Sequence, residues 1–463
     1  MGELPGLKKP SGKKFLFRWT ILLFLALFFG MRASAEEISS KKEVLTLIRA
    51  LEILKENNLE LQELQAEIRR MEAKNAEARA LPGPTLRFTS SYSESRGAFG
   101  GFFAGISFPG GGGGFSPMQA PPAPSGAQTT KALIGSASYL LFSGGKIQAW
   151  QQQARLGLVI AKKNYEKRLK ELELEVVKAY LNVLEAKHLL EVAERTRENL
   201  KELLRVTQLR FEAGTAPRVE VLRAETEVAN AEVQVIQAKN AVDTAYAFLM
   251  NILNLPQTEE WELEEVAPPE KRVEISLEEA KEKGWSLRPE KQIAEYALAL
   301  SREGIKIHQA DRYPSFSFSH TRAWLESPFF RDKTSWSAGL TASWLIFDAG
   351  ATRARIRQAY EEMQKSRARY ERLRSAVELE ITQVWNQVKF AEEAYEAAKR
   401  GMETAREALR ISLVRYEAGF GLQLEVLDAH TSFARAQFGY FRALYQLIYA
   451  RASLNKALAQ PIL

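Results

Sequence analysis

Four segments of this chain alternate between apolar and polar residues, which is the two-residue period of a β-strand with one apolar face. The alternation is clearest in residues 334–347 and is repeated in 314–324. It is weaker in 84–93 and 132–142. Each segment has about ten residues, the length that a tilted strand needs to cross a membrane. The apolar side chains expected to share an outer face are Phe316, Phe318, Trp336, Leu340, Trp344 and Ile346.

After the second strand of each pair, the pattern changes to that of long helices. Residues 146–213 and 351–418 contain no proline and one glycine each. This predicts two long helices, each about 100 Å in length. In 221–252 and 426–457, apolar residues recur in alternating steps of three and four, with alanine at every second position. This heptad spacing predicts left-handed knobs-into-holes packing of closely spaced helices.

The whole pattern occurs twice. Residues 209–214 match 414–419, and 139–145 match 344–350, both at an offset of 205. Nearer the start of each copy the offset is 230, as for Pro84 and Pro314. A fixed internal offset of this kind indicates a duplicated architecture.

Two repeats follow from these matches. Residues 36–270 form the first, with a helical hairpin tip near Gly214, and 271–463 form the second, with a tip near Gly419. The difference between the two offsets falls in the Gly- and Pro-rich segment 97–126. That segment is predicted to be a long loop and not a phosphate cradle, because no Gly-Lys-Ser/Thr follows its glycines. The sequence assigns it no role.

Residues 1–35 have the features of a secretory signal peptide. A basic start precedes an apolar run from Trp19 to Phe29, and Ala33-Ser34-Ala35 has the form that signal peptidase cleaves. An uncleaved anchor is the alternative. The chain has a net charge of +7, of which residues 1–35 carry +5, so its high pI does not indicate nucleic-acid binding. The chain has no cysteine, which excludes disulfides and an N-terminal lipid anchor.

No catalytic or metal site is evident. His188, His308, His320 and His430 are far apart in the sequence, and none has a partner three or four residues later that would make a known metal-binding motif. The sequence contains no Gly-x-Ser-x-Gly motif and no dinucleotide fingerprint. We therefore expect no enzymatic activity, no cofactor and no bound metal.

After residue 35, no segment is apolar for long enough to form a transmembrane helix, which needs about 20 residues. A membrane location would therefore depend on the strands, whose apolar faces would contact lipid. Four strands cannot close a barrel, since known barrels begin at about eight. We expect a mainly α-helical chain whose strands complete a membrane β-barrel with those of other copies. A soluble sandwich and an ordinary two-stranded coiled coil are the alternatives.

The order of these features resembles the TolC-like outer-membrane efflux proteins. The resemblance rests on the duplicated plan, on Phe142-Ser-Gly-Gly145 and Phe347-Asp-Ala-Gly350, and on the Phe/Tyr-Glu-Ala-Gly turns that end at Gly214 and Gly419. It covers the chain from about residue 40 to the C-terminus. It implies a homotrimer in which three chains form one twelve-stranded barrel and a periplasmic tube of coiled-coil helices.

The resemblance also implies a function. The chain would be the outer-membrane channel of a tripartite efflux or type I secretion system, a passive exit duct that extends into the periplasm. Its partners would be a periplasmic membrane-fusion adaptor and an inner-membrane pump of the RND, ABC or MFS type. The alternative is a periplasmic or surface structural coiled-coil protein.

By the same resemblance, the hairpin tips would contact the adaptor. The matching residues are Arg210, Phe211, Gly214, Val221, Leu222, Arg415, Tyr416, Gly419, Val426 and Leu427. Each tip glycine could also serve only as a helix C-cap in a left-handed conformation.

The resemblance further implies a periplasmic gate at Glu425 and Asp428. These residues are three apart and therefore project from one helical face. Three chains would gather six carboxylates around one axis, which would favour bound cations. The first repeat has Glu220 and Arg223 at these positions, so the acidic pair is specific to the second repeat. The alternative is a pair of acids that stabilises the start of a helix.

Overall fold

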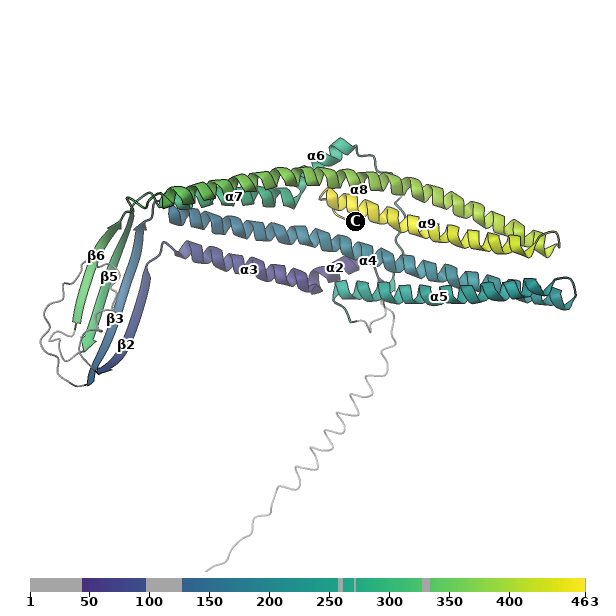
Figure 1. The fold of residues 1–463 in the computed structure, drawn as a ribbon, viewed down its shortest axis with the longest axis horizontal. Coiled ribbons are helices and arrows are strands. Elements are labelled where there is room, and N and C mark those ends of the chain that lie inside the picture. Colours follow the sequence, from purple (N-terminus) through teal and green to yellow (C-terminus); the bar gives the residue numbers. More distant parts are fainter. Residues whose placement is uncertain (1–43, 97–126, 257–260, 270–271, 327–333, 463) are drawn as a thin grey trace, which may run out of the picture.

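The computed structural model describes residues 44–96, 127–256, 261–269, 272–326 and 334–462. The predicted signal peptide and the segment 97–126 lie outside the described residues. The molecule is elongated, with a four-stranded sheet at one end and two helical hairpin tips at the other (Figure 1). The prediction of a mainly α-helical chain is confirmed.

The described elements follow the same order in both halves of the chain. The first half contains β1 (Val44–Leu45), α2 (Leu47–Asn57), α3 (Leu59–Ala80), β2 (Thr85–Arg96), β3 (Ala127–Phe142), α4 (Lys146–Glu212) and α5 (Arg218–Leu253). The second contains β4 (Glu262–Leu263), α6 (Leu277–Leu287), α7 (Pro289–Ala310), β5 (Ser315–Glu326), β6 (Thr334–Ser343), α8 (Ala351–Glu417) and α9 (Gln423–Ala457). Helices α4 and α8 both have 67 residues, and α3 and α7 both have 22.

A capping side chain fixes the start of the first helix in each half. The Thr46 side chain accepts a hydrogen bond from the backbone N–H of Arg49 at 3.0 Å at the start of α2. Its counterpart Ser276 forms a full capping box with Glu279 at the start of α6. Each cap satisfies backbone donors that the first helical turn leaves unpaired.

The two long helices organise the rest of the body. On the side nearer the sheet, α3 packs on α4, and α7 packs on both α4 and α8. On the side nearer the tips, α5 packs on α4, and α9 packs on both α8 and α4. Thus α3 and α5 follow one another along α4, and α7 and α9 follow one another along α8 (Figure 1).

In each half, one helix ends where the next begins along the long helix: α5 meets α3 along α4, and α9 meets α7 along α8. The side chains that join these two pairs of helix ends differ between the halves. Between α5 and α3, the Asn58 amide donates to the carbonyl of Ile252 at 3.1 Å, and the Asn254 amide donates to that of Asn57 at 3.3 Å. Between α9 and α7, the link runs through Glu380 of α8, which accepts hydrogen bonds from Arg288 at the start of α7 and from Lys456 of α9. The two repeats therefore share a backbone plan but not the side chains that join its parts.

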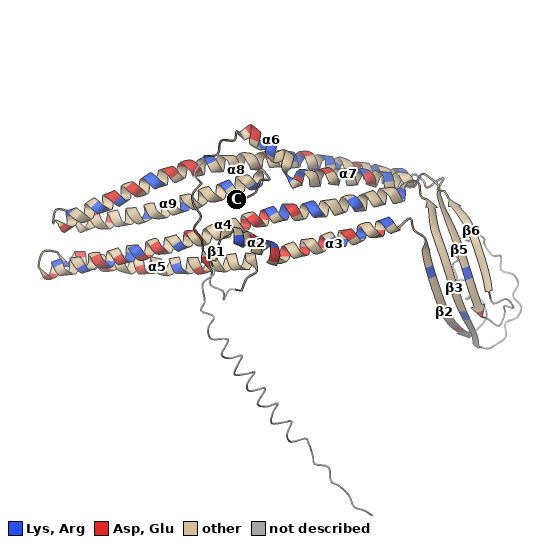
Figure 2. Cartoon of the chain, turned by 180° about the vertical axis from the view of Figure 1, so that it is seen from behind, with Lys and Arg blue, Asp and Glu red and all other residues tan. Residues whose placement is uncertain are grey.

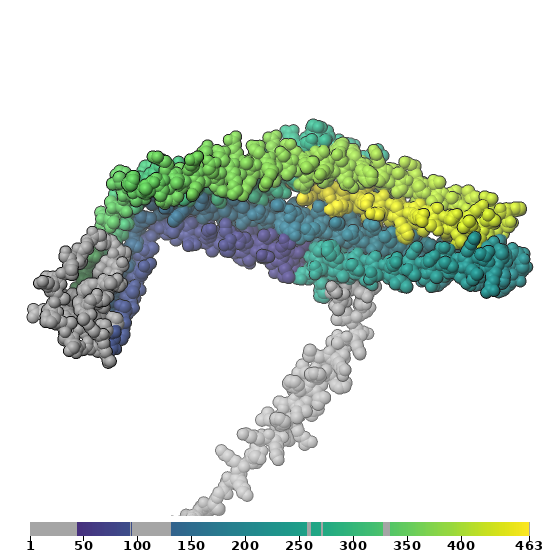
Figure 3. All heavy atoms as spheres, in the orientation of Figure 1, coloured from purple at the N-terminus to yellow at the C-terminus, as the bar shows by residue number. Residues whose placement is uncertain are grey.

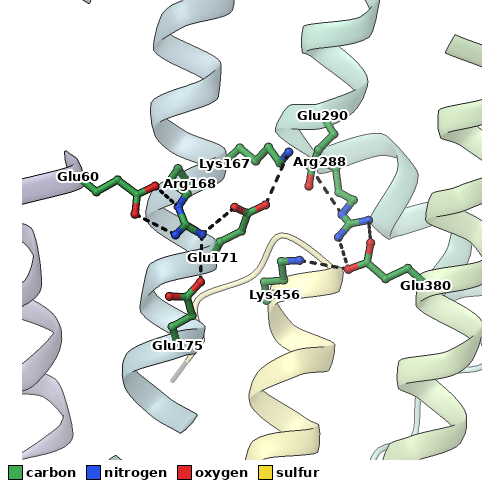
Figure 4. A network of polar contacts seen from close by, with 9 residues as sticks. All are labelled: Glu60, Lys167, Arg168, Glu171, Glu175, Arg288, Glu290, Glu380 and Lys456. Carbon is green, nitrogen blue, oxygen red and sulfur yellow. Dashed lines mark hydrogen bonds and ion pairs between the residues drawn. The ribbon is translucent and has the colours of Figure 1, made fainter. Parts of the chain in front are cut away.

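The Arg288 guanidinium is buried, with a side-chain exposure of 2%, and donates to Glu380 at 2.7 and 2.8 Å (Figure 4). Lys456, in the last turn of α9, donates to the same carboxylate at 3.1 Å. Burial alone would raise the pKa of Glu380. The hydrogen bond and charge of Arg288, together with the charge of Lys456, outweigh burial and hold this pKa at about 2.

A second ionic cluster joins α3 to α4 in the same region of the molecule (Figure 4). Arg168 of α4 donates to the two oxygens of Glu60 at 2.6 and 2.9 Å. It also donates to Glu171 and Glu175 on its own helix, at 3.2 and 3.0 Å. A planar guanidinium suits this bidentate contact with a carboxylate.

The sheet is antiparallel throughout, with the order β2-β3-β5-β6. The central β3–β5 pair joins the two halves of the chain, for example through Ser138 opposite Ser319. Strands β2 and β6 lie at the two edges. Predicted outer-face residues in the strands are exposed, at 42% for Phe316, 39% for Phe318, 74% for Trp336 and 75% for Leu340.

The prediction that the last strand extends to residue 347 is wrong, because β6 ends at Ser343 and leaves Trp344 and Ile346 outside it. The counterpart strand β3 continues to Phe142 because β5 pairs with it there. In β6, Ser343 pairs with Ser315, the first residue of β5, and no described strand lies beside the residues that follow. Trp344 instead donates its indole N–H to the carbonyl of Arg312 at 3.0 Å.

Charged side chains are dense along the helices and sparse on the strands (Figure 2). Among the described helices, none is both long enough and apolar enough to cross a membrane.

Candidate functional site

Both hairpin tips lie at the end of the molecule opposite the sheet (Figure 1). At each tip a glycine has a left-handed backbone, with φ of +72° at Gly214 and +82° at Gly419. The N–H of Gly214 donates to the carbonyl of Phe211 at 2.9 Å, and that of Thr215 donates to Arg210 at 2.8 Å. This is a Schellman motif, which satisfies the last carbonyls of the helix. The glycines therefore act as C-caps, whatever else the tips do.

The two tips are in direct contact. Arg210 of the first tip donates to the carbonyl oxygens of Tyr416 and Glu417, at 2.7 and 3.2 Å. Its guanidinium also lies 4.2 Å from the centre of the Tyr416 ring. A cation over an aromatic face is attracted by the ring quadrupole. Arg210 thus joins the end of α4 to the end of α8.

A buried polar cluster makes a second connection between the tips. Thr207 donates its hydroxyl to the carbonyl of Leu203 at 2.8 Å and therefore accepts from Tyr416, at 3.3 Å. Gln423 donates its amide to Thr207 at 3.2 Å and to the carbonyl of Glu220 at 3.0 Å. Sequence reasoning missed Thr207 and Gln423. The available signal was a polar residue on an otherwise apolar helix face.

Three residues predicted to dock an adaptor are not accessible. Tyr416, Val426 and Leu427 are 3%, 0% and 8% exposed. They pack with Leu200 and Leu203 of α4 in a small core between the two hairpins. The prediction that these three face a partner is therefore corrected, because the second hairpin uses this side to contact the first.

Other tip residues do lie on the surface. Phe211 is 43% exposed and Leu222 is 51% exposed, and Arg415 is also exposed. Val221 and Arg210 are half-buried. Further exposed apolar residues near the tips were not predicted: Leu209, Val219, Val414, Phe420, Leu422 and Leu424.

Glu425 and Asp428 are both exposed on the first turns of α9, but they have different neighbours. The Glu425 carboxylate lies 3.7 Å from the guanidinium of Arg415, at the end of α8. Asp428 lines a groove of about 500 Å³ between α5 and α9, and Arg223 lines the same groove. Each carboxylate therefore has a basic residue nearby, a feature that the resemblance did not imply.

In the described part of the chain, no three His, Asp or Glu side chains are grouped so that they could hold a metal ion.

Comparison with known proteins shows which family the chain matches. A family model described as outer membrane efflux protein matches residues 50–255 and 286–460. The alkaline protease secretion protein AprF of Pseudomonas aeruginosa is 23% identical over 308 residues, which cover 64% of this chain and 63% of AprF. The outer membrane protein TolC of Escherichia coli is 22% identical over 306 residues, which cover 62% of this chain and 60% of TolC. The matched region thus spans less than two thirds of either relative.

The fold is also similar to that of solved structures. The outer-membrane channel OprN superimposes with a TM-score of 0.74 at 21% identity, and the match covers 90% of each chain.

Proposed function

Because this chain belongs to the outer membrane efflux protein family, we propose that it is the outer-membrane channel of a tripartite efflux or type I secretion system. It would act as a passive exit duct for substrates delivered by an inner-membrane pump through a periplasmic adaptor. The pump would be of the RND, ABC or MFS type. Members of the family are efflux proteins, which agrees with the prediction that the chain is not an enzyme. Export would use residues 1–35 as a cleaved signal peptide.

One observation carries the proposal that the working unit is a ring of several chains. Helices α4 and α8 are repeat counterparts of equal length, but α4 buries 21 residues and α8 buries seven. The difference arises because α7 and α9 of the second repeat both pack on α4, while no described helix of the first repeat packs in the equivalent way on α8. Exposed apolar residues on α8 include Leu379 and Phe390, at 58% and 62%. An unpartnered apolar face of this kind indicates an interface.

Helix α5 has the complementary surface. On α9, Leu427 is 8% exposed, and Phe441 stacks on His188 of α4 with a ring separation of 4.2 Å. Their counterparts on α5, Leu222 and Ile236, are 51% and 67% exposed. If the contact between α9 and α4 is repeated between chains, α5 of one copy packs on α8 of the next. A head-to-tail contact of this kind gives a closed ring when the rotation between copies returns to the first one.

The sheet supports the same arrangement. The β3–β5 pair joins the two halves within a chain, and the equivalent pair between chains would be β6 with β2 of the next copy. Three copies would then form a barrel of twelve strands, with Trp336 and Leu340 facing lipid. A closed barrel leaves no unpaired strand edge in the membrane.

In this assembly the hairpin tips would face the periplasmic adaptor. The exposed tip residues Phe211 and Arg415 would contribute to that surface, whereas Leu222 would be covered by the neighbouring copy, and Glu425 and Asp428 would line the periplasmic entrance.

The test is the mass of the detergent-extracted protein complex from the outer-membrane fraction. We expect three chains. Two chains would give only eight strands, too narrow for a wide conduit. A monomer, or a protein found in the soluble periplasmic fraction, would refute the channel and favour the structural coiled-coil alternative.

A further inference from the structure

The outer face of the strands carries two basic side chains, although charges are sparse on the sheet (Figure 2). The sheet projects beyond the helical body, so no described helix packs on it (Figures 1 and 3). Along β5, the residues that share a face with Phe316 and Phe318 include Arg322. On β3 the same face carries Lys131, which lies opposite Tyr92 of β2. Both bases therefore lie on the side that the proposed barrel would turn to lipid.

The two bases occupy the same level of the two repeats. Tyr92 lies directly opposite Lys131 in the first repeat, and Arg322 lies directly opposite Trp336 in the second. Tyr92 is the counterpart of Arg322, 230 residues earlier, and Lys131 is the counterpart of Trp336, 205 residues earlier. Each repeat thus places one base beside one aromatic residue at this level, with the order of the two reversed.

Trp336 and Trp344 mark the two limits of the apolar outer face, and both are exposed, at 74% and 59%. They are eight residues apart in the sequence, which corresponds to about 20 Å along the membrane normal for a strand tilted by about 40°. Membrane barrels have an apolar band about 25 Å tall between two rings of aromatic residues at the lipid head groups. Trp336 is at the end away from the helices, so Arg322 beside it would lie at the head groups of the outer leaflet.

The two bases have different surroundings within the chain. The ammonium group of Lys131 lies 3.8 Å from the Glu326 carboxylate. Arg322 lies two outward-facing positions nearer the helices, is exposed, and takes part in no ion pair among the described residues. Gly135 lies opposite it on β3, where an added Cβ would meet no atom of a more distant residue within 4 Å. The Arg322 guanidinium therefore has open space beside it, and a charge on a lipid-facing surface requires a partner of opposite charge.

We propose that Arg322, with Trp336 beside it, binds the phosphate group of a phosphorylated lipid in the outer leaflet. The inference rests on the proposed channel function, because it requires the sheet to be part of a membrane barrel. A planar guanidinium can hold two oxygens of one phosphate, and the indole ring of Trp336 offers an apolar surface at the level of the head groups. Lys131, about 14 Å further along the strands, contributes a second positive charge to the same surface. Repeated in each copy, the site holds the barrel at a fixed depth in the membrane.

The test measures lipid binding to the purified full-length oligomer in detergent by native mass spectrometry. The probe is lipid A with two phosphate groups, and the reference is the same lipid without them. We expect the wild type to bind the phosphorylated form about tenfold more tightly, as hydrogen bonds between charged groups predict. Arg322→Gln should remove most of this preference. Lys131→Gln should lower it less, because Lys131 already has Glu326 beside it.

Arg87→Gln is the matched control. Arg87 is an exposed residue of β2 between Leu86 and Phe88, so it lies on the opposite face of the sheet, which would line the barrel lumen. The substitution removes the same charge from the same sheet and should leave the preference for the phosphorylated lipid unchanged. Binding of the lipid without phosphates should be equal in all variants, which shows that each barrel is intact.

The outcomes separate this inference from the proposed function. If the wild type is not an oligomer of the outer membrane, the channel itself is refuted. If it is such an oligomer but binds both lipids equally, or if Arg322→Gln keeps the wild-type preference, the lipid site is refuted while the channel stands. Equal losses in Arg322→Gln and Arg87→Gln would also overturn the site, because they would reflect net charge alone. Complete competition by inorganic phosphate at the concentration of the lipid would overturn it as well, because the ligand would then be the free ion.

Discussion

At the scale of single residues, the most tightly determined contact is the ion pair between Arg288 and Glu380. Arg288 is the C-cap residue of α6 and the N-cap residue of α7, and its side chain is 2% exposed. Glu380 is 38% exposed and also holds Lys456. Loss of the Glu380 charge leaves the buried Arg288 with the more distant carboxylate of Glu290, 3.8 Å away, and removal of one partner of a buried ion pair is strongly destabilising.

We expect Glu380→Gln to lower the free energy of unfolding by about 3 kcal/mol, at the low end for a buried pair because Glu380 is partly exposed. Chemical unfolding of the detergent-solubilised protein, followed by circular dichroism, measures this change. Glu378→Gln is the matched control, since the ion pair that Glu378 forms among the described residues is with Arg374 on the helix surface. Surface pairs of this type contribute about 0.3–0.5 kcal/mol. Equal effects of the two variants would contradict the importance of the buried pair.

The titration of Glu380 also makes the free energy of unfolding depend on pH, and the direction of that dependence follows from its pKa. The pKa of Glu380 is lowered in the folded chain from 4.5 to about 2. Its stabilising effect is therefore complete above pH 4.5 and is lost as the pH falls towards 2. The wild type should lose more stability over this interval than Glu380→Gln does. Parallel curves for the two proteins would show that Glu380 does not titrate in this way.

At the scale of elements, the two sheet edges predict a register between chains. Within the chain, Ser138 of β3 lies opposite Ser319 of β5. The repeat counterpart of Ser138, 205 residues later, is Ser343 of β6. The counterpart of Ser319, 230 residues earlier, is Thr89 of β2, so Ser343 should lie opposite Thr89 of the neighbouring copy. Both residues are exposed in the single chain.

We expect a chain carrying Ser343→Cys and Thr89→Cys to form disulfides between copies under mild oxidation, seen as covalent oligomers on a non-reducing gel. Directly opposed residues in antiparallel strands lie about 4.5–5.5 Å apart, within the range for a disulfide. The background is clean because the chain has no cysteine. Ser335→Cys with Thr89→Cys, far out of register, should give none. Equal cross-linking of both pairs would refute the register.

At the scale of the whole molecule, the contrast between the two repeats predicts where assembly can be broken. Ile236 is 67% exposed in the single chain, whereas its counterpart Phe441 packs on α4. A charge at position 236 is therefore harmless to one chain but would be buried between two.

We expect Ile236→Glu to reduce the fraction of trimer in the detergent extract, measured by native mass spectrometry, with little change in helix content. Gln234→Glu is the control, because both Gln234 and its counterpart Gly439 are exposed. Trimer yield equal to that of the wild type for Ile236→Glu would place the interface on another face of α5.

Local features of the sequence were enough to predict the repeated plan. The alternation of two residues located the strands, the absence of proline set the lengths of α4 and α8, and the tip glycines marked the turns at Gly214 and Gly419. These features depend on the backbone and on neighbours a few residues away, so the sequence carries them directly.

Only the tertiary structure decided which equivalent surfaces are covered. Leu222 and Leu427 have the same local pattern, but the second is buried because α9 lies between α8 and α4. The end of β6 at Ser343 and the contact of Gln423 with Thr207 likewise depend on partners about 30 to 200 residues away. Two copies of one pattern are locally alike, but a single chain gives them different neighbours, and burial depends on the neighbours.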